Sequence, residues 1–156
     1  MNSETRLVAL CRERGVTLAT AESCTGGMVA ARITSVPGAS AVFLGSIVSY
    51  ANDAKQSLLG VPRDVLEREG AVSPGCAAVM AEGVRRMLGA GVAVSVTGIA
   101  GPGGATPEKP VGLVWFGVAA HGGARTERRV FMGGRGHVRR QAADHALTLL
   151  LDAARL

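Results

Sequence analysis

The sequence is poor in aromatic residues and in cysteine, and it has no apolar run long enough to cross a bilayer. One Trp, one Tyr and three Phe provide no stacking platform for single-stranded nucleic acid, which is therefore a disfavoured partner. The three cysteines are odd in number and lack CxxC spacing, which argues against a disulfide framework and a zinc site. We therefore expect reduced thiols, no membrane association and a cytoplasmic location.

Metal and cofactor motifs are also lacking. The histidines share no ligand spacing with one another or with the cysteines, so no metal site is predicted. The glycine-rich segment at residues 97–104 is neither a GxGxxG fingerprint nor a Walker A loop, because no Gly-Lys-Ser or Gly-Lys-Thr follows it. Its backbone amides would still suit a phosphate or a carboxamide.

Lysine is scarce, with two residues against fifteen arginines. Arginine stays protonated at working pH, whereas a buried lysine can lose its proton and act as a base toward a serine hydroxyl. Lys55 is therefore a candidate base, although an ordinary lysine on a helix surface is the structural alternative. Lys109 is expected to brace the neighbouring glycine-rich loop.

What the sequence does contain fits one globular domain over residues 1–156, since 47% of the residues are hydrophobic and 19% are charged. The formal net charge is +5. It is concentrated at residues 125–140, which hold six arginines and one acidic residue. This basic zone favours an anionic partner, either a phosphate-bearing metabolite or, less well supported, nucleic acid.

Apolar periodicity and turn residues predict alternating helices and strands. Helices are expected at residues 3–14, 25–33, 52–59, 62–69, 74–88 and 136–153, and buried strands at residues 16–20, 42–50, 92–97 and 111–119. A further strand at residues 125–132 forms a hairpin with the preceding one. This order predicts a layered α/β/α domain with a mixed, mostly parallel sheet.

Three loops follow the carboxyl ends of predicted buried strands, after residues 20, 50 and 97. Open sheets of this class bind ligands at those ends. We therefore expect the three loops to converge on one site.

Ser23 lies in the first of these loops, in a turn that enters a helix. The amides that begin this helix would hold an oxyanion. Helix capping by Ser23 or Thr25 is the simpler structural explanation. Gly26 and Gly27 cost helix propensity in the first turn, however, which favours close approach of a ligand to the backbone. Ser23 is thus the candidate nucleophile.

Two further residues of the loops carry suitable chemistry. Tyr50, the only tyrosine, ends the second predicted strand and would relay a proton or bind a substrate amide, although a half-buried structural tyrosine is the commoner case. Glu22 adjoins Ser23 and either orients the site or pairs with a cation.

Five ordered blocks together resemble the CinA family: TAESCTGG at residues 20–27, SYANDAK at 49–55, GAVS at 70–73, VTGIAGPGG at 96–104 and EKPVG at 108–112. The chain looks like the CinA C-terminal domain in its stand-alone form. The resemblance implies hydrolysis of the carboxamide of nicotinamide mononucleotide to nicotinate mononucleotide and ammonia in pyridine nucleotide salvage, without a cofactor. It also suggests a homodimer.

Carried over by position, the resemblance assigns catalytic roles to four residues: Ser23, Tyr50, Lys55 and Thr97. Neutral Lys55 would take the proton of Ser23, which then attacks the amide carbon, and water would hydrolyse the acyl enzyme. The substrate-binding residues implied are Cys24, Thr25, Gly26, Gly27, Gly98, Gly101, Arg135 and Arg139.

The C-terminal block departs from the family pattern. The family usually has Gly-Asp-Arg before a Val-Arg pair, whereas this chain has Gly134 in place of the aspartate, followed by Arg135 and, further on, Arg139. Arg135 is still expected to bind the substrate phosphate and to lower the pKa of Lys55 by its charge.

Two other functions remain open. A regulatory nucleotide-binding module would keep the fold and lose turnover, and a DNA-damage partner protein would use the basic zone. The set of Ser23, Tyr50 and Lys55 favours the hydrolase, because a binding module has no need of a deprotonatable lysine beside a serine.

Overall fold

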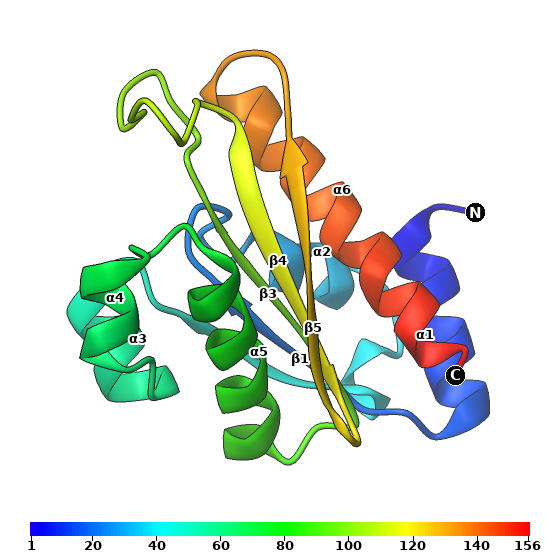
Figure 1. Ribbon diagram of the computed structural model, residues 1–156. Coiled ribbons are helices and arrows are strands. Elements are labelled where there is room, and N and C mark those ends of the chain that lie inside the picture. The colour runs from blue at the N-terminus through cyan, green and yellow to red at the C-terminus, as the bar shows by residue number, and fades with distance from the viewer.

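A five-stranded sheet lies between two layers of helices in the computed structural model, which describes residues 1–156 (Figure 1). The strands are β1 (Leu18–Glu22), β2 (Phe43–Val48), β3 (Val92–Gly98), β4 (Leu113–Ala120) and β5 (Gly123–Val130). The helices are α1 (Ser3–Arg14), α2 (Met28–Thr34), the short 3₁₀ helix η1 (Ala39–Ala41), α3 (Asn52–Leu59), α4 (Arg63–Arg68), α5 (Pro74–Leu88) and α6 (Arg135–Ala154). No helix has the length and apolar character needed to span a membrane.

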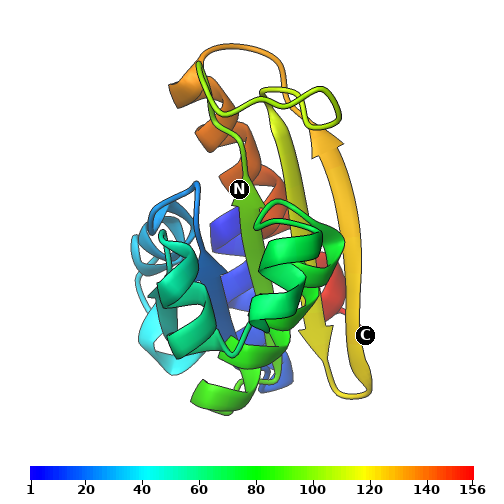
Figure 2. The same cartoon turned by 60° about the vertical axis from the view of Figure 1, so that its left-hand side comes forward.

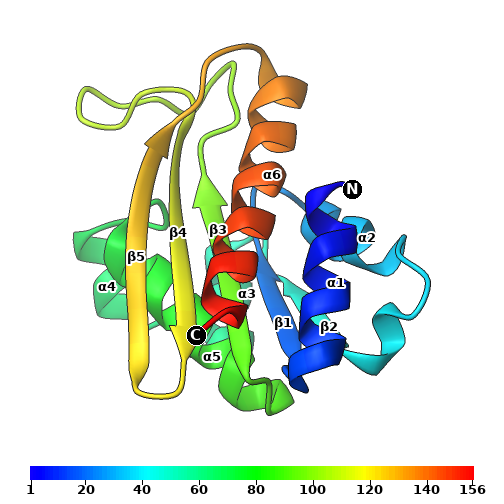
Figure 3. The ribbon, with the colours of Figure 1, turned by 90° about the vertical axis from the view of Figure 1, so that its right-hand side faces the viewer.

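The strands follow the order β2-β1-β3-β4-β5. β1 is parallel to both of its neighbours, β2 and β3, while β4 and β5 extend the sheet with antiparallel pairing. The α/β fold with a mixed sheet and a terminal hairpin is therefore as predicted. The carboxyl ends of the three parallel strands lie at the same end of the sheet, together with the loop that follows β3 and the start of α6 (Figures 1 and 3).

Each face of the sheet has its own apolar core. α1, α2 and α6 cover one face, over a cluster of 24 buried residues (Figure 3). α3, α4 and α5 cover the other face, where a smaller cluster of nine buried residues lies beneath α3 and α5 (Figure 2). A Cβ on Gly83 would lie 2.3 Å from the carbonyl oxygen of Leu59, so glycine lets α3 pack directly on the backbone of α5.

The structure corrects three expectations for the segments around the site. The strand predicted at residues 16–20 runs to Glu22, and α2 begins at Met28 instead of residue 25, so residues 23–27 form the turn. β2 was expected to be buried, but Leu44 and Val48 are 44% and 45% exposed. β2 is an edge strand, and an apolar run does not by itself distinguish an edge strand from a central one.

Candidate active site

The three predicted loops converge on one pocket. Its cavity of about 190 Å³ is lined by Ser23, Cys24, Tyr50, Asn52, Lys55, Ala71, Val72, Thr97, Gly98, Ala100 and Arg135. A larger groove of about 710 Å³ involves residues around the amino ends of β1 and β3 and contains none of the predicted site residues. The convergence at the carboxyl ends of the parallel strands is therefore confirmed.

Strand register brings three hydroxyl-bearing residues into a row. Glu22 pairs with Val48 on β2 and with Val96 on β3. Ser23 follows Glu22, Ser49 follows Val48, and Thr97 follows Val96. Side chains alternate along a strand, so the three hydroxyl-bearing residues lie on the opposite face of the sheet from the residues that precede them. The exposed fractions of Ser23, Ser49 and Thr97 are 8%, 0% and 1%. The row lies on the face covered by α3 and α5.

Lys55 reaches this row from α3. Its Nζ lies 3.0 Å from Ser23 Oγ and 2.9 Å from the carbonyl oxygen of Tyr50. The side chain is 1% exposed and makes no ion pair with a carboxylate. Burial lowers the pKa of Lys55 below its usual 10.5, because desolvation disfavours the charged amine. The predicted cause, the charge of Arg135, is not the one that acts.

The contacts of Lys55 are compatible with a role as a base. A neutral amine has two N–H groups and one lone pair. Lys55 Nζ donates to the Tyr50 carbonyl and to Ser23 Oγ, and the lone pair of the neutral amine can instead accept the hydroxyl proton of Ser23. This is the geometry in which a general base removes the proton of a serine nucleophile.

Glu22 orients the turn around Ser23 and contacts no cation. It is fully buried, and six donor groups lie within hydrogen-bond distance of its carboxylate, three hydroxyls and three backbone amides of the α2 entry. The donors are Thr20, Thr25 and Ser46 by their hydroxyls and Gly27, Val29 and Ala30 by their amides. A carboxylate at a helix N-terminus is favoured by the helix dipole. The expected oxyanion position at the first amides of the helix is thus occupied by Glu22.

Two backbone donors remain for an oxyanion. The amides of Cys24 and Thr25 donate no hydrogen bond within the chain, whereas the amide of Gly26 donates to the Ser23 carbonyl at 3.0 Å. Of the backbone amides expected to hold the oxyanion, only those of residues 24 and 25 are therefore free to do so. Burial raises the pKa of the Cys24 thiol to about 11, so this cysteine stays protonated and does not compete with Ser23 as a nucleophile.

The remaining catalytic candidates differ in how they face the pocket. The hydroxyl of Thr97 donates to the carbonyl of Ala71 at 2.9 Å, which leaves only its lone pairs for a ligand. Tyr50 contacts Lys55 by its backbone carbonyl, while its side chain is 63% exposed and its phenol oxygen lies 3.2 Å from Arg135 Nη2. Arg135 also donates to the carbonyl of Gly101 at 2.8 Å, so Gly101 orients this arginine and does not line the pocket.

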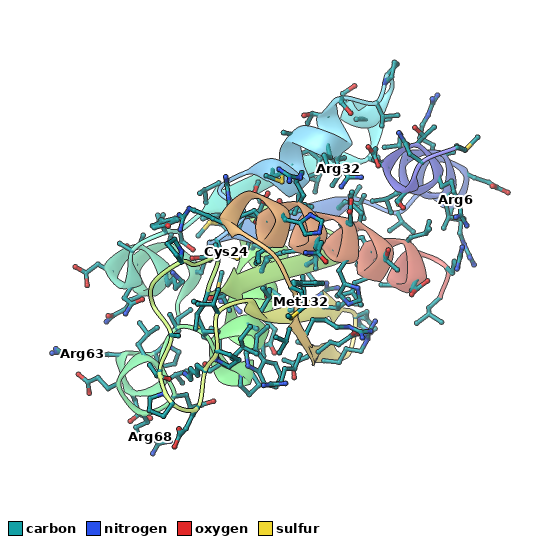
Figure 4. The ribbon with its side chains drawn as sticks, turned by 90° about the horizontal axis from the view of Figure 1, so that it is seen from above. Arg6, Cys24, Arg32, Arg63, Arg68 and Met132 are labelled. Carbon is teal, nitrogen blue, oxygen red and sulfur yellow. The ribbon has the colours of Figure 1, made fainter.

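Arg139 supports the nucleophile turn from the other side. Its guanidinium donates to the carbonyls of Cys24 and Thr25 at 3.0 and 3.2 Å, and it does not line the pocket. Seen from above, Cys24 lies near the first turns of α6 (Figure 4). Gly27 adopts φ +104° where α2 begins, a conformation that glycine readily adopts.

The basic zone at residues 125–140 divides between two parts of the molecule. Its first arginines lie on β5, where Arg125 and Arg129 pair with Glu127. Its last arginines lie on α6, where two of them contact the site. Lys109 donates to the carbonyl of Glu69 at the end of α4, and the expected bracing of the glycine-rich loop stays a prediction.

The sequence analysis did not identify Ser49 as a site residue, and it did not foresee that six donor groups surround the Glu22 carboxylate. Ser49 is the one residue with a buried side-chain oxygen or nitrogen that has no hydrogen-bond partner. The signal was present, because Ser49 begins the block SYANDAK that also contains Tyr50 and Lys55.

Comparison with known proteins gives consistent matches. A family model described as the CinA C-terminal domain matches residues 1–154. CinA-like proteins from Anaeromyxobacter dehalogenans and Akkermansia muciniphila are 54% identical over 149 residues and 52% identical over 153 residues, covering 96% and 97% of this chain. The chain spans only 36% and 37% of the length of these two relatives.

Solved structures agree closely with the fold. The competence/damage inducible protein CihA from Agrobacterium tumefaciens is 40% identical with a TM-score of 0.94, covering 99% of this chain and 94% of that one. A CinA superfamily protein from Klebsiella pneumoniae is 33% identical with a TM-score of 0.94, covering 99% of both chains.

Proposed function

Since this chain belongs to the CinA C-terminal domain family, we propose that its pocket hydrolyses a carboxamide, and that the substrate is nicotinamide mononucleotide. The products are nicotinate mononucleotide and ammonia. The observation that carries this proposal is the 3.0 Å contact between Ser23 Oγ and the buried Nζ of Lys55, which makes no ion pair with a carboxylate. A site that only binds a nucleotide has no use for a buried lysine of lowered pKa beside a serine.

The reaction proceeds in two stages. Lys55 takes the hydroxyl proton of Ser23 while Ser23 Oγ attacks the carboxamide carbon, and the amides of Cys24 and Thr25 stabilise the oxyanion. When the carbon–nitrogen bond breaks, the ammonium of Lys55 returns its proton to the leaving nitrogen and ammonia departs. Water then attacks the acyl ester, with Lys55 accepting a proton from the water and returning it to Ser23.

The pocket selects the end of the substrate that reacts. A volume of about 190 Å³ is below the usual range for ligand sites, about 300–1,000 Å³. It suits a pyridine ring with its carboxamide, while the ribose and the phosphate extend to the mouth. Arg135 lies at this mouth beside Tyr50, where its guanidinium would bind the phosphate.

The test is incubation of the purified protein with nicotinamide mononucleotide, followed by measurement of ammonia and nicotinate mononucleotide. Ser23→Ala is the paired control. Release of both products by the wild type and not by Ser23→Ala supports the amidase and its nucleophile together. Tight nucleotide binding without release of ammonia by either protein would instead favour the regulatory binding module.

A further inference from the structure

The buried hydroxyl of Ser49 has no partner within the protein. Its side chain is fully buried, and Ser49 Oγ makes no hydrogen bond, although the backbone amide donates to the Glu22 carbonyl at 2.9 Å. A buried hydroxyl without a partner destabilises the folded state, and an alanine at the same position would not incur that cost. Its presence therefore calls for a functional explanation.

The position of Ser49 connects it with Lys55. Ser49 lies beside Ser23 in the row of hydroxyls, on the sheet face that α3 covers. It also immediately precedes Tyr50, whose carbonyl accepts a hydrogen bond from Lys55 Nζ. The unpartnered hydroxyl and the buried amine therefore lie at the same strand end.

Lys55 requires one more acceptor during the reaction than it has at rest. After it takes the proton of Ser23, its ammonium has three N–H groups. Ser23 Oγ and the Tyr50 carbonyl accept two of them. A third N–H without an acceptor would be costly in a buried site.

The other groups that face Lys55 do not supply this acceptor. The thiols of Cys24 and Cys76 have pKa values raised to about 11 by burial and stay protonated. The carboxylate of Glu22 lies on the opposite face of the sheet, surrounded by its own donors. The other polar side chains that line the pocket are Asn52, Thr97, Arg135 and the phenol of Tyr50, and those of Asn52 and Tyr50 are exposed. Thr97 faces the ligand space, and Arg135 is a cation.

We propose that Ser49 is a positioning residue for Lys55: its hydroxyl oxygen, after rotation about the Cα–Cβ bond, accepts the third N–H of the Lys55 ammonium that forms during the reaction. When Lys55 is neutral the bond is not made, and the hydroxyl stands unpartnered as the structure has it. The inference rests on the proposed role of Lys55 as the base. It assigns Ser49 no contact with the substrate.

The chain offers a direct measurement, because it contains only two lysines. Protein labelled with ¹³C at the lysine ε-carbon gives two signals, and Lys109→Arg identifies the one from Lys55. In Ser49→Ala the pKa of Lys55 should fall by roughly 0.5 to 1 pH unit, because a hydrogen bond to the charged form has been lost. The kcat for amide hydrolysis should fall about tenfold, while Tm should equal or exceed that of the wild type.

Two further variants separate this role from a structural one. Ser46→Ala removes a hydroxyl from the same strand on the opposite face, where it contacts Glu22 and Thr20; it should lower Tm and leave the pKa of Lys55 in place. Ser49→Thr keeps the hydroxyl and should restore the pKa of Lys55 if it folds.

An unchanged pKa of Lys55 in Ser49→Ala overturns the inference, whatever happens to Tm. If the wild type releases no ammonia but the pKa of Lys55 falls in Ser49→Ala, the link between Ser49 and Lys55 stands and the proposed amidase activity fails. The NMR titration needs no substrate, so the two failures are distinguishable.

Discussion

Lys55 Nζ lies 3.0 Å from Ser23 Oγ, although 32 residues separate the two in the sequence. Ser23 follows the central strand β1, and Lys55 lies on α3, the first helix after the edge strand β2. The contact therefore exists only when β1 and β2 are paired and α3 is packed on the sheet. The chemistry proposed for this pocket depends on that one contact.

Replacement of Lys55 should abolish turnover without unfolding the protein. Lys55→Met removes the base and should lower kcat by about 10³-fold or more, while a buried amine is exchanged for an apolar chain of similar size, so stability should be retained. Lys55→Arg keeps the charge but not the deprotonatable nitrogen and should be as inactive. Ammonia release and circular dichroism measure the two effects, and activity near that of the wild type in Lys55→Arg would contradict the mechanism.

The lowered pKa of Lys55 fixes how activity and stability depend on pH. The kcat/KM should rise with pH through the lowered pKa and then level off, because the neutral amine is the active form. The unfolded chain holds this proton up to the usual pKa of 10.5, so unfolding takes up a proton between the folded and unfolded values. The free energy of unfolding should therefore rise with pH in that window, relative to Lys55→Met.

Comparison with Lys55→Met is needed in this measurement because the three buried cysteines act in the opposite direction. Their pKa values, raised from 9.0 to about 11, make the folded state less stable as pH rises through that range. If the free energy of unfolding of the wild type, relative to Lys55→Met, falls with pH in this window, the expected direction is contradicted.

Replacement of Arg135 and of Arg139 by glutamine should affect substrate binding, turnover and stability differently. Arg135→Gln removes the cation at the pocket mouth and should raise KM for a phosphorylated substrate about tenfold or more, with little change in Tm. Arg139→Gln removes the donors to the carbonyls of Cys24 and Thr25 and should lower kcat and Tm. Steady-state kinetics with thermal unfolding distinguish the two; equal effects on KM would mean that both arginines bind the phosphate.

Glu22→Gln should destabilise the protein although it conserves shape. The amide nitrogen that replaces one carboxylate oxygen cannot accept hydrogen bonds, so at least one buried amide of the α2 entry loses its partner. We expect a loss of about 2 kcal/mol or more in the free energy of unfolding, together with reduced turnover, measured by urea denaturation. Glu67→Gln, on an exposed helix pair, is the matched control and should change little.

Gly134→Asp should stabilise the protein. Gly134 is the N-cap of α6 and makes no side-chain capping bond, and a Cβ there meets nothing within 4 Å. An aspartate would cap the helix and favour its dipole, adding about 0.5 kcal/mol. Thermal unfolding measures the gain, with Gly103→Asp, also in open space but outside a helix, as the control. A lowered Tm in Gly134→Asp would mean that the added carboxylate draws Arg135 from its contacts.

The fold class could be predicted from the sequence because it depends on local signals, and the sequence also singled out Ser23 and Lys55, which the structure brings into contact. Apolar runs with turn residues predicted the alternating elements, and the rarity of lysine drew attention to Lys55. One helix start was poorly predicted: α2 begins three residues later than expected because the Glu22 carboxylate, fixed by β1, caps it.

The sequence by itself determined which chemical groups the pocket would contain, since the residues that follow each parallel strand are set by chain order. Only the tertiary structure decided how they are used. Strand order made β2 an edge strand, register placed Ser49 beside Ser23, and burial of the Lys55 side chain between α3 and the sheet lowered its pKa. These outcomes arise from pairing and desolvation between segments far apart in the chain, which no local pattern encodes.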